Sequence, residues 1–158
     1  MTLSHLDADG RARMVDVGDK PVTERRAVAA GLIRMTPAAF AEVVAHGGPK
    51  GDILGTAELA GVMGAKRTAE LIPLCHTLPL EQIEVQASLD ERLPGVRVEA
   101  RVRTAGRTGV EMEAMTAVAI ALLTVYDMVK ATGHDLEIGE VRLVEKTGGR
   151  SGDWRRAP

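Results

Sequence analysis

Two neighbouring segments near the middle of the chain alternate strictly between apolar and polar residues. They cover residues 83–90 and 96–103, and Pro94-Gly95 lies in the link between them. The apolar positions are Ile83, Val85, Ala87 and Leu89 in the first segment and Val96, Val98, Ala100 and Val102 in the second. A period of two is typical of strands with one buried face, and a proline–glycine pair favours a turn. The pattern therefore predicts an antiparallel hairpin with one face exposed to water.

Helical signals precede this hairpin twice. Thr36 followed by proline predicts an N-cap, and the helix that it starts should end at the Gly47-Gly48 pair. A second helix is predicted from about Asp52 to just before Pro73, with small residues recurring along it at helical spacing. These residues, which let another element approach closely, are Ala57, Ala60, Gly61, Gly64 and Ala65.

A third helix is predicted over about residues 112–132, and it is apolar nearly all round. Such a helix must be covered on most sides. Because one small domain can hardly provide that cover, we expect contacts between subunits.

Residues 26–35 and 136–144 favour two more strands, and Val28, Ala30 and Leu32 share one face of the first. Without one extra helix, the order of elements is the βαββαβ plan of ferredoxin-like folds. We therefore predict an α+β fold in which helices pack on a four-stranded antiparallel sheet. The length of 158 residues indicates a single domain over 1–158, with a flexible polar arm at 1–20 and a flexible glycine-rich tail at 147–158.

The composition and the pattern of apolar residues indicate which partners and which cellular location to expect. The net charge is −2 and the chain has one Trp, one Tyr and one Phe, so nucleic acid is not the expected partner. No apolar run approaches the roughly 20 residues of a membrane span. The N-terminal residues lack the apolar core of a secretory signal, and the single Cys75 can form no disulfide within the chain. We expect a cytoplasmic protein that contacts no membrane.

Lys50 lies in the segment GGPKGD, directly before the predicted second helix. Free backbone N–H groups at a helix N-terminus favour an anion, and the lysine would add a charge. The segment differs from a Walker A motif, since its lysine precedes the glycine and no Ser or Thr follows. Taken alone, it is better explained as an ordinary turn between helices.

Cys75 and His76 lie between two prolines in the largely apolar segment LIPLCHTLPL. Neighbours in extended chain point in opposite directions, so they do not form a nucleophile–base pair. The four histidines show no ligand spacing, and we predict no metal site. His76 is either a hydrogen-bonding or acid–base group or a histidine with a purely structural role.

Charged residues lie near both ends of the predicted third helix. Glu111 and Glu113 would share a face in extended chain but diverge in a helix, where acidic residues also suit the first turn. Asp127 and Lys130 are three residues apart and are neighbours on one helical face. A surface ion pair explains them, but an aspartate so late in a helix faces the negative end of the dipole, which favours a functional interpretation.

Taken together and in order, several blocks of the sequence resemble the molybdenum-cofactor biosynthesis protein C family, the cyclic pyranopterin monophosphate synthases. The blocks are KGDILGTAELAGVMGAKRTAELIPLCH, TGVEMEAMTA, YDMVK and KTGGRSGDW, and MVDVGDK at 14–20 resembles the family's N-terminal block. The resemblance covers nearly the whole chain. The sequence departs from the family pattern at Thr77, Arg107 and Trp154, which stand in place of proline, lysine and phenylalanine.

The resemblance implies a lyase of molybdenum-cofactor biosynthesis. Its substrate would be a cyclised dihydro-GTP in which C8 of the base is bonded to C3′ of the ribose. Its products would be cyclic pyranopterin monophosphate and pyrophosphate. Every step of this reaction moves protons and none requires a redox cofactor, so we expect acid–base groups in a closed pocket and no cofactor.

By position, the resemblance implies catalytic roles for Asp127, Lys130 and Lys50. The residues that it implies in substrate binding are Leu74, Cys75, His76, Glu111, Met112, Glu113 and Lys146. It also implies a homohexamer, a trimer of dimers with sites at dimer interfaces. We expect the functional residues to converge on one pocket, to which a neighbouring subunit can contribute Lys50.

Two other classes of function stay open. A non-catalytic ferredoxin-like module could bind a nucleotide and regulate a partner, whereas a structural assembly subunit would bind no nucleotide. Neither class needs two lysines, a histidine and three carboxylates in polar loops. Turnover of the cyclised dihydro-GTP separates the enzyme from both.

Overall fold

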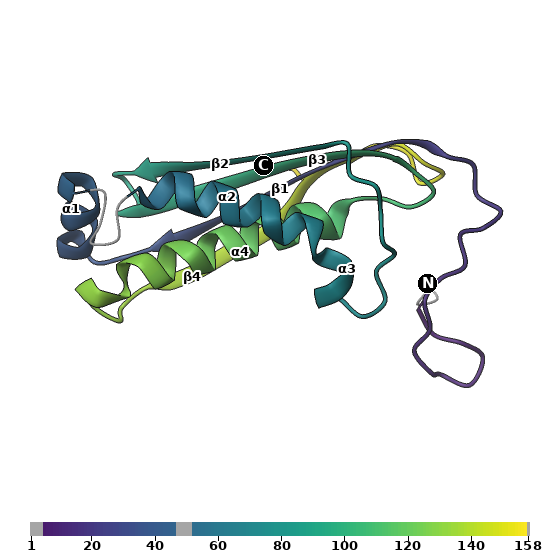
Figure 1. The fold of residues 1–158 in the computed structure, drawn as a ribbon, viewed down its shortest axis with the longest axis horizontal. Helices are drawn as coiled ribbons and strands as arrows, with labels where there is room; N and C mark the ends of the chain where they lie inside the picture. The colour runs from purple at the N-terminus through teal and green to yellow at the C-terminus, as the bar shows by residue number, and fades with distance from the viewer. Residues whose placement is uncertain (1–4, 47–51, 158) are drawn as a thin grey trace.

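One open sheet organises the fold. The computed structural model describes residues 5–46 and 52–157. In this part of the chain, five strands pair antiparallel in the order β2-β3-β1-β4-β5 (Figure 1). The strands are β1 (Thr23–Arg34), β2 (Gln82–Asp90), β3 (Gly95–Gly106), β4 (Glu137–Thr147) and β5 (Trp154–Arg155).

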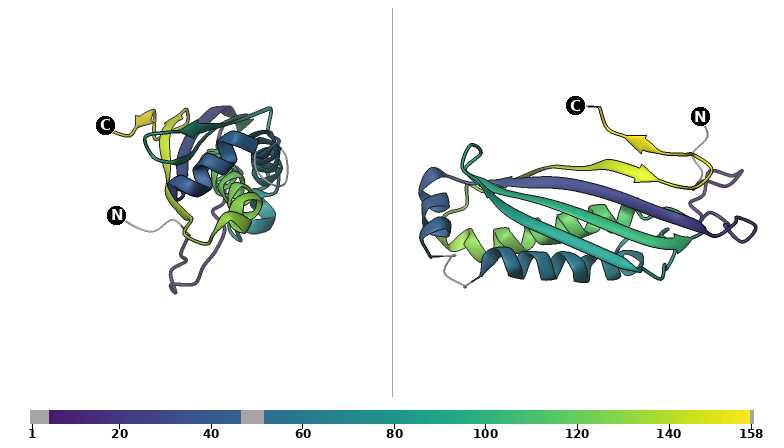
Figure 2. Two further views of the ribbon diagram at one scale, coloured as in Figure 1. Left: turned by 90° about the vertical axis from the view of Figure 1, so that its left-hand side faces the viewer. Right: turned by 90° about the horizontal axis from the view of Figure 1, so that it is seen from above.

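Two helices, α2 (Ile53–Lys66) and α4 (Glu111–Val129), cover one face of this sheet. α4 continues into the 3₁₀ helix η1 (Lys130–Thr132). α1 (Pro37–His46) lies at one end of the sheet, and the short α3 (Thr68–Leu71) follows α2 (Figure 1). α2 and α4 lie side by side along the strands, so the described chain forms two layers (Figure 2). Thr36 caps α1 as predicted, since its Oγ1 accepts a hydrogen bond from Ala39 N at 3.1 Å.

The core lies between the sheet and the helix pair. A Cβ atom on Gly31 of β1 would lie 2.8 Å from Val118 and 2.9 Å from Leu122, so this glycine lets the strand approach α4 closely. The buried inward-facing residues of β1 and β3 are Ala27, Ala29, Ile33, Val96, Val98, Ala100 and Val102. Val28, Ala30 and Leu32 lie together on the opposite face of β1, so the prediction that they share one face is confirmed.

The predicted hairpin is confirmed. Val85 pairs with Ala100 and Ala87 pairs with Val98, so the apolar positions of the two strands share one face. Gly95 starts β3 where an added Cβ would overlap the carbonyl oxygen of Ile33, which explains the glycine of the Pro-Gly link.

The predicted stripe of small residues on α2 lets another helix approach closely, as its composition indicated. A Cβ on Gly64 would lie 2.8 Å from Ile120, and one on Gly61 would lie 3.0 Å from the carbonyl oxygen of Ala117. Both glycines therefore allow α2 to lie directly against α4.

Several elements differ from the predictions. The sheet has five strands rather than four, because the glycine-rich tail folds back and β5 pairs with β4 through Glu145–Arg155 and Lys146–Trp154. The second predicted helix is divided into α2 and α3 at Arg67. The third begins at Glu111 and gives way to a 3₁₀ turn after Val129. The fold is mixed α and β with an antiparallel sheet, and its ferredoxin-like assignment stays a prediction.

The structure corrects our reason for expecting subunit contacts. The sheet and α2 cover α4 on most sides within one chain, and ten of its residues are buried. The expectation that no apolar segment approaches the length of a membrane span is wrong, because Glu111–Thr132 is long and apolar enough to cross one. Half of its apolar window is, however, buried inside this fold. We conclude that α4 is the core helix of the domain.

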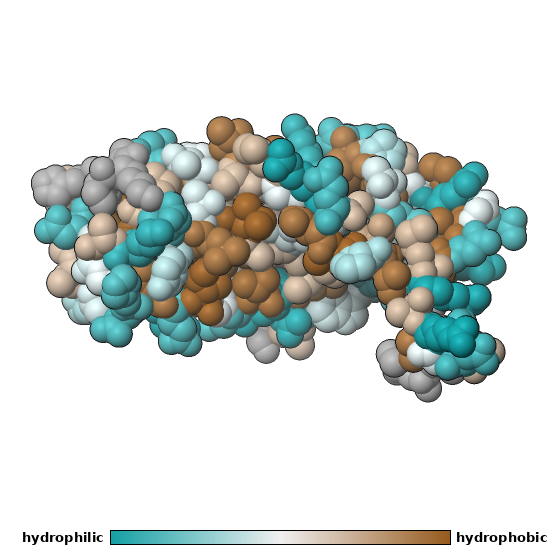
Figure 3. Space-filling view, turned by 60° about the horizontal axis from the view of Figure 1, so that its bottom comes forward, coloured by the Kyte–Doolittle hydropathy of each residue, from teal (hydrophilic) through white to brown (hydrophobic). Residues whose placement is uncertain are grey.

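An apolar surface nevertheless remains on the helix layer. Leu59 and Met63 of α2 and Leu123 of α4 expose 63%, 48% and 55% of their surface. Apolar side chains gather on this face of the molecule, as Figure 3 shows. We call these three residues the helix-face patch.

Candidate active site

The predicted substrate-binding residues gather at the N-terminal end of α4, around two adjoining hollows. The first, which we call the loop pocket, has a volume of about 400 Å³. The loop after α3, the start of α4 and the N-terminal arm line it. Its lining includes all six of Leu74, Cys75, His76, Glu111, Met112 and Glu113, together with His5, Val15, Val17, Lys20, Leu78, Thr108 and Gly109.

His76 connects the loop to the N-terminal arm. Its Nε2 lies 2.8 Å from the carbonyl oxygen of Val15. A carbonyl can only accept a hydrogen bond, so Nε2 carries the proton. In the neutral ring, Nδ1 is then the nitrogen that can accept a proton or a hydrogen bond.

Glu113 is the buried carboxyl of the loop pocket, with 4% of its surface exposed. Desolvation raises its pKa from 4.5 to about 7, and the neighbouring charge of Glu111 acts in the same direction. Burial likewise raises the pKa of the Cys75 thiol, with a further contribution from Glu113. Near neutral pH, Glu113 can therefore both give and take a proton, whereas Cys75 stays a thiol.

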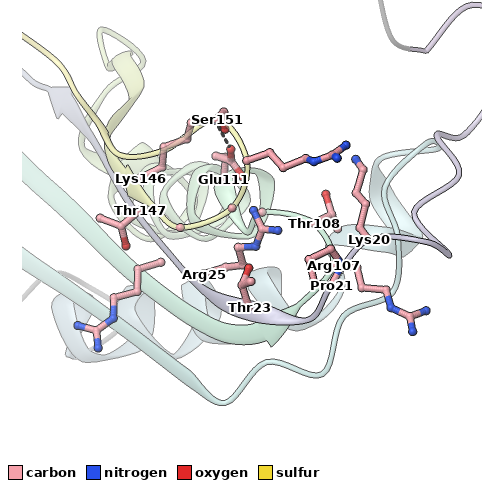
Figure 4. A pocket seen from close by; sticks show the side chains of 15 residues that line it. Lys20, Pro21, Thr23, Arg25, Arg107, Thr108, Glu111, Lys146, Thr147 and Ser151 are labelled. Carbon is pink, nitrogen blue, oxygen red and sulfur yellow. Dashed lines mark hydrogen bonds and ion pairs between the residues drawn. The ribbon is translucent and has the colours of Figure 1, made fainter.

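The second hollow, which we call the cationic cleft, has a volume of about 510 Å³. Figure 4 shows how Thr23 and Arg25 of β1, Lys146 of β4 and Glu111 of α4 surround it. Its basic lining residues are Lys20, Arg25, Arg26, Arg107, Lys146 and Arg150, and Glu111 is the carboxylate among its lining residues. Such an excess of positive charge in a hollow favours an anionic ligand.

Two groups in the cationic cleft lack a partner in the described part of the chain. Arg25 Nε and Thr23 Oγ1 are buried, yet neither makes a hydrogen bond there. Buried polar atoms are almost always hydrogen-bonded, so these two atoms beside the cleft are exceptions. Lys146, by contrast, lies 3.1 Å from Glu111 Oε1.

The two hollows belong to one site, because Lys20, Thr108, Gly109 and Glu111 line both of them. Glu111 is the group that joins their chemistry, since its carboxylate binds Lys146 on one side and raises the pKa of Glu113 on the other. An added Cβ on Gly109 would overlap this carboxylate, so the glycine leaves room for it.

Asp127 and Lys130 lie at the other end of α4. Lys130 Nζ is 2.7 Å from Asp127 Oδ1, and both side chains are about half exposed. The hydrogen bond to Asp127 raises the pKa of Lys130 above its ordinary value, so this lysine is charged at neutral pH. The sixteen residues from Glu111 to Asp127 correspond to about 24 Å along the helix axis.

A single chain therefore does not bring all the predicted site residues into one pocket, and their convergence at an interface between subunits stays a prediction. The fold brings together the seven predicted substrate-binding residues, but it places Asp127 and Lys130 far from them because α4 is straight and continuous. Lys50 lies outside the described residues. No group of three or more His, Cys, Asp or Glu side chains in the described ranges could hold a metal ion.

Comparison with known proteins gives the family. The model of the MoaC family matches residues 14–149. The chain belongs to the MoaC family. Proteins of Brucella ovis, Brucella abortus and Brucella suis, each named cyclic pyranopterin monophosphate synthase, are 55% identical to it over 152 residues. Each match covers 96% of this chain and 92% of its relative.

Several lining residues of this MoaC-family site escaped the sequence analysis. They are Lys20, Thr23, Arg25, Thr108 and Arg150. The sequence of β1 does not distinguish Arg25 from the other arginines of the strand, and only the fold shows that Arg25 lines the cleft. Arg150 carried a usable signal, because it sits in the same glycine-rich block as Lys146. Arg107, which departs from the family pattern, also lines the cationic cleft.

Proposed function

We propose that this chain is a cyclic pyranopterin monophosphate synthase, a lyase of molybdenum-cofactor biosynthesis. It would convert 3′,8-cyclised dihydro-GTP into cyclic pyranopterin monophosphate and pyrophosphate without a cofactor. One observation carries the proposal: a pocket with a proton-exchanging carboxyl adjoins a cleft with six basic residues. The relatives that are 55% identical to this chain bear the name of the same activity.

The cationic cleft would bind the triphosphate. Phosphate oxygens suit the Arg25 guanidinium and the Lys146 ammonium, since charge-assisted hydrogen bonds to phosphate are the strong ones. Arg107 would keep the charge of the family's lysine with a planar, forked geometry. As pyrophosphate forms, these cations stabilise the charge that develops on the leaving group.

The loop pocket would bind the base and move its protons. Opening and reclosing the base transfers protons to and from ring nitrogens and carbons, and a group with a pKa near the working pH does this best. Glu113 has such a pKa, and Nδ1 of His76 is available in the neutral ring. Cys75 and Met112 supply apolar contact for the ring faces.

The last step is a transesterification at phosphorus. A ribose hydroxyl loses its proton and its oxygen attacks the α-phosphorus. The bond from that phosphorus to the bridging oxygen breaks, and pyrophosphate leaves with the bonding pair. A base must therefore take one proton, and positive charge must lie at the leaving oxygens. Lys130, charged through Asp127, fits the second role as a general acid or phosphate clamp.

Asp127 and Lys130 can reach this substrate only from another subunit. Catalytic groups act within roughly 3 Å of the atoms they serve, whereas about 24 Å of helix separates these residues from Glu111. In a twofold dimer, the end of α4 that carries Lys130 can meet the cationic cleft of the partner, and the symmetry produces two equal sites. We also propose a catalytic role for Lys50.

Assembly beyond the dimer is part of the proposal. The helix-face patch of Leu59, Met63 and Leu123 would pack against further copies, which gives a hexamer as a trimer of dimers. We also propose a cytoplasmic location, which a single half-buried cysteine suits.

The test is turnover by the purified chain. With cyclised dihydro-GTP as substrate, we expect equimolar release of pyrophosphate and cyclic pterin without added metal or redox cofactor. Binding of the substrate with release of neither product would favour the regulatory module. A protein that bound no nucleotide would favour the assembly subunit.

A further inference from the structure

We propose that Gly149 is a positioning residue of the site, because the space left by its missing side chain seats the guanidinium of Arg25 in the cationic cleft. This inference rests on the proposed function, in which Arg25 binds the polyphosphate. Gly149 itself touches no reacting atom.

The contact between the two residues is direct. An added Cβ on Gly149 would overlap Nη1 and Cζ of Arg25, and it would lie 2.9 Å from Nη2. The guanidinium therefore occupies the volume that any other residue at position 149 would fill. Because this group is the far end of a flexible side chain, a substitution would move Arg25 rather than break the fold.

The turn that carries Gly149 lies directly on β1 and is closed by hydrogen bonds of its own. An added Cβ on Gly148 would overlap the carbonyl oxygen of Glu24, so this turn lies directly on the strand next to Arg25. Asp153 Oδ1 accepts a hydrogen bond from Gly148 N at 3.1 Å, and Gly152 N donates to the carbonyl oxygen of Gly149 at 3.2 Å. The seat is therefore part of the folded scaffold.

The Nε of Arg25 is buried and has no hydrogen-bond partner in the described chain, so no bond at this atom fixes the orientation of the head. Arginine heads are often oriented by two parallel hydrogen bonds to a carboxylate or a phosphate. Packing on the flat surface of a glycine orients the head while leaving its donors to a ligand. Gly149 would thus keep the Arg25 guanidinium ordered while its hydrogen-bond donors stay available to a ligand.

The experiment compares alanines at two glycines of the same turn. Gly149 and Gly152 have φ angles of +77° and +66°, so an alanine strains the backbone similarly at either position. A Cβ on Gly152, however, would meet nothing within 4 Å. Gly149→Asn adds a second probe, since asparagine tolerates positive φ better than alanine but still fills the seat.

The first readout is pyrophosphate binding by calorimetry on the assembled full-length protein. We expect Gly149→Ala and Gly149→Asn to weaken binding about tenfold or more, as loss of a charged hydrogen bond does, and Gly152→Ala to stay within about twofold. In turnover, KM should rise more than kcat falls, because Arg25 holds the polyphosphate before and during the reaction.

The second readout separates positioning from general damage to the turn. If Gly149 acts through Arg25, Gly149→Ala should cost nothing further in an Arg25→Ala background. An equal loss in both backgrounds would overturn the proposal, and so would Gly149 variants that bind pyrophosphate like Gly152→Ala or a wild type that binds none. A wild type that binds pyrophosphate but forms no cyclic pterin would refute the proposed function while this binding test still decides the role of Gly149.

Discussion

Replacing Glu113 by glutamine should change how stability depends on pH. The folded state raises the pKa of Glu113 from 4.5 to about 7, chiefly by desolvation. The folded chain therefore holds more protons than the unfolded chain between these two values, and the free energy of unfolding falls as pH rises through that window. A shift of this size, at roughly 1.4 kcal/mol per unit, costs about 3 kcal/mol above pH 7.

Glutamine fills nearly the same volume and carries no titrating proton. The Glu113→Gln variant should therefore match the wild type near pH 4.5 and exceed its stability at pH 8, by up to about 3 kcal/mol. For a chain of this length, that difference corresponds to roughly 6–12 °C in Tm. The gain should come with loss of most turnover, because the variant cannot exchange the proton.

The assay is thermal unfolding of ligand-free wild type and variant at four pH values from 5 to 8. Glu91→Gln, which makes the same chemical change at an exposed position of the β2–β3 turn, is the matched control. The difference in Tm between Glu113→Gln and wild type should grow with pH, while the difference for Glu91→Gln stays flat. Parallel curves for all three proteins would refute the desolvation of Glu113.

Three further predictions follow from the site and the surface. Lys130→Arg should keep the fold and the charge but lose most of kcat for pyrophosphate release; full activity in this variant would remove Lys130 as an acid–base group. Asp127→Asn should keep substrate binding while slowing the reaction. Lys146→Met should raise KM about tenfold or more by removing a phosphate contact, and an unchanged KM would place the triphosphate elsewhere. Leu123→Glu on the helix-face patch should lower the mass of the assembly measured by light scattering, whereas Leu89→Glu, at the exposed end of β2, should leave it unchanged. A Leu123→Glu assembly of wild-type mass would place the interface between subunits on another face.

Local periodicity in the sequence predicted most elements of the fold. The alternation at 83–90 and 96–103 predicted β2 and β3 because a half-buried strand leaves a period of two in its sequence. Gly61 and Gly64 predicted close helix packing for a similarly local reason, since a missing side chain has few other uses in a helix. The fifth strand left no such pattern, because β5 has two residues and is defined by its pairing with β4.

The site was predictable only where residues share a sequence block. Leu74, Cys75 and His76 lie in one loop, and Glu113 lies in another block that the family resemblance marks. Arg25 could not be singled out, because its role depends on the side of β1 that it occupies and on the turn at Gly149, more than 120 positions away. The distance between the two ends of α4 also required the structure, since a sequence block says nothing about which chain completes a site.

In the proposed arrangement two chains complete each active site, one with its cationic cleft and the other with Lys130. Lys146→Ala and Lys130→Ala each remove one half, so each homogeneous assembly should keep about a tenth of the wild-type rate or less at a substrate concentration below the wild-type KM. After the two variants are dissociated, mixed in equal amounts and reassembled, half of the clefts and half of the lysines are intact. About a quarter of the sites should then regain both halves.

The matched control mixes Lys146→Ala with Glu113→Gln, whose changes both lie in the cleft-bearing half, so every site stays broken. The decisive measurement is the rate of cyclic pterin release by each mixture, relative to wild type treated in the same way. A site shared between two chains predicts recovery of about a quarter of the wild-type rate for the Lys146→Ala and Lys130→Ala mixture and no recovery for the control. Reassembled mixed oligomers with no recovered activity would contradict a site shared between chains.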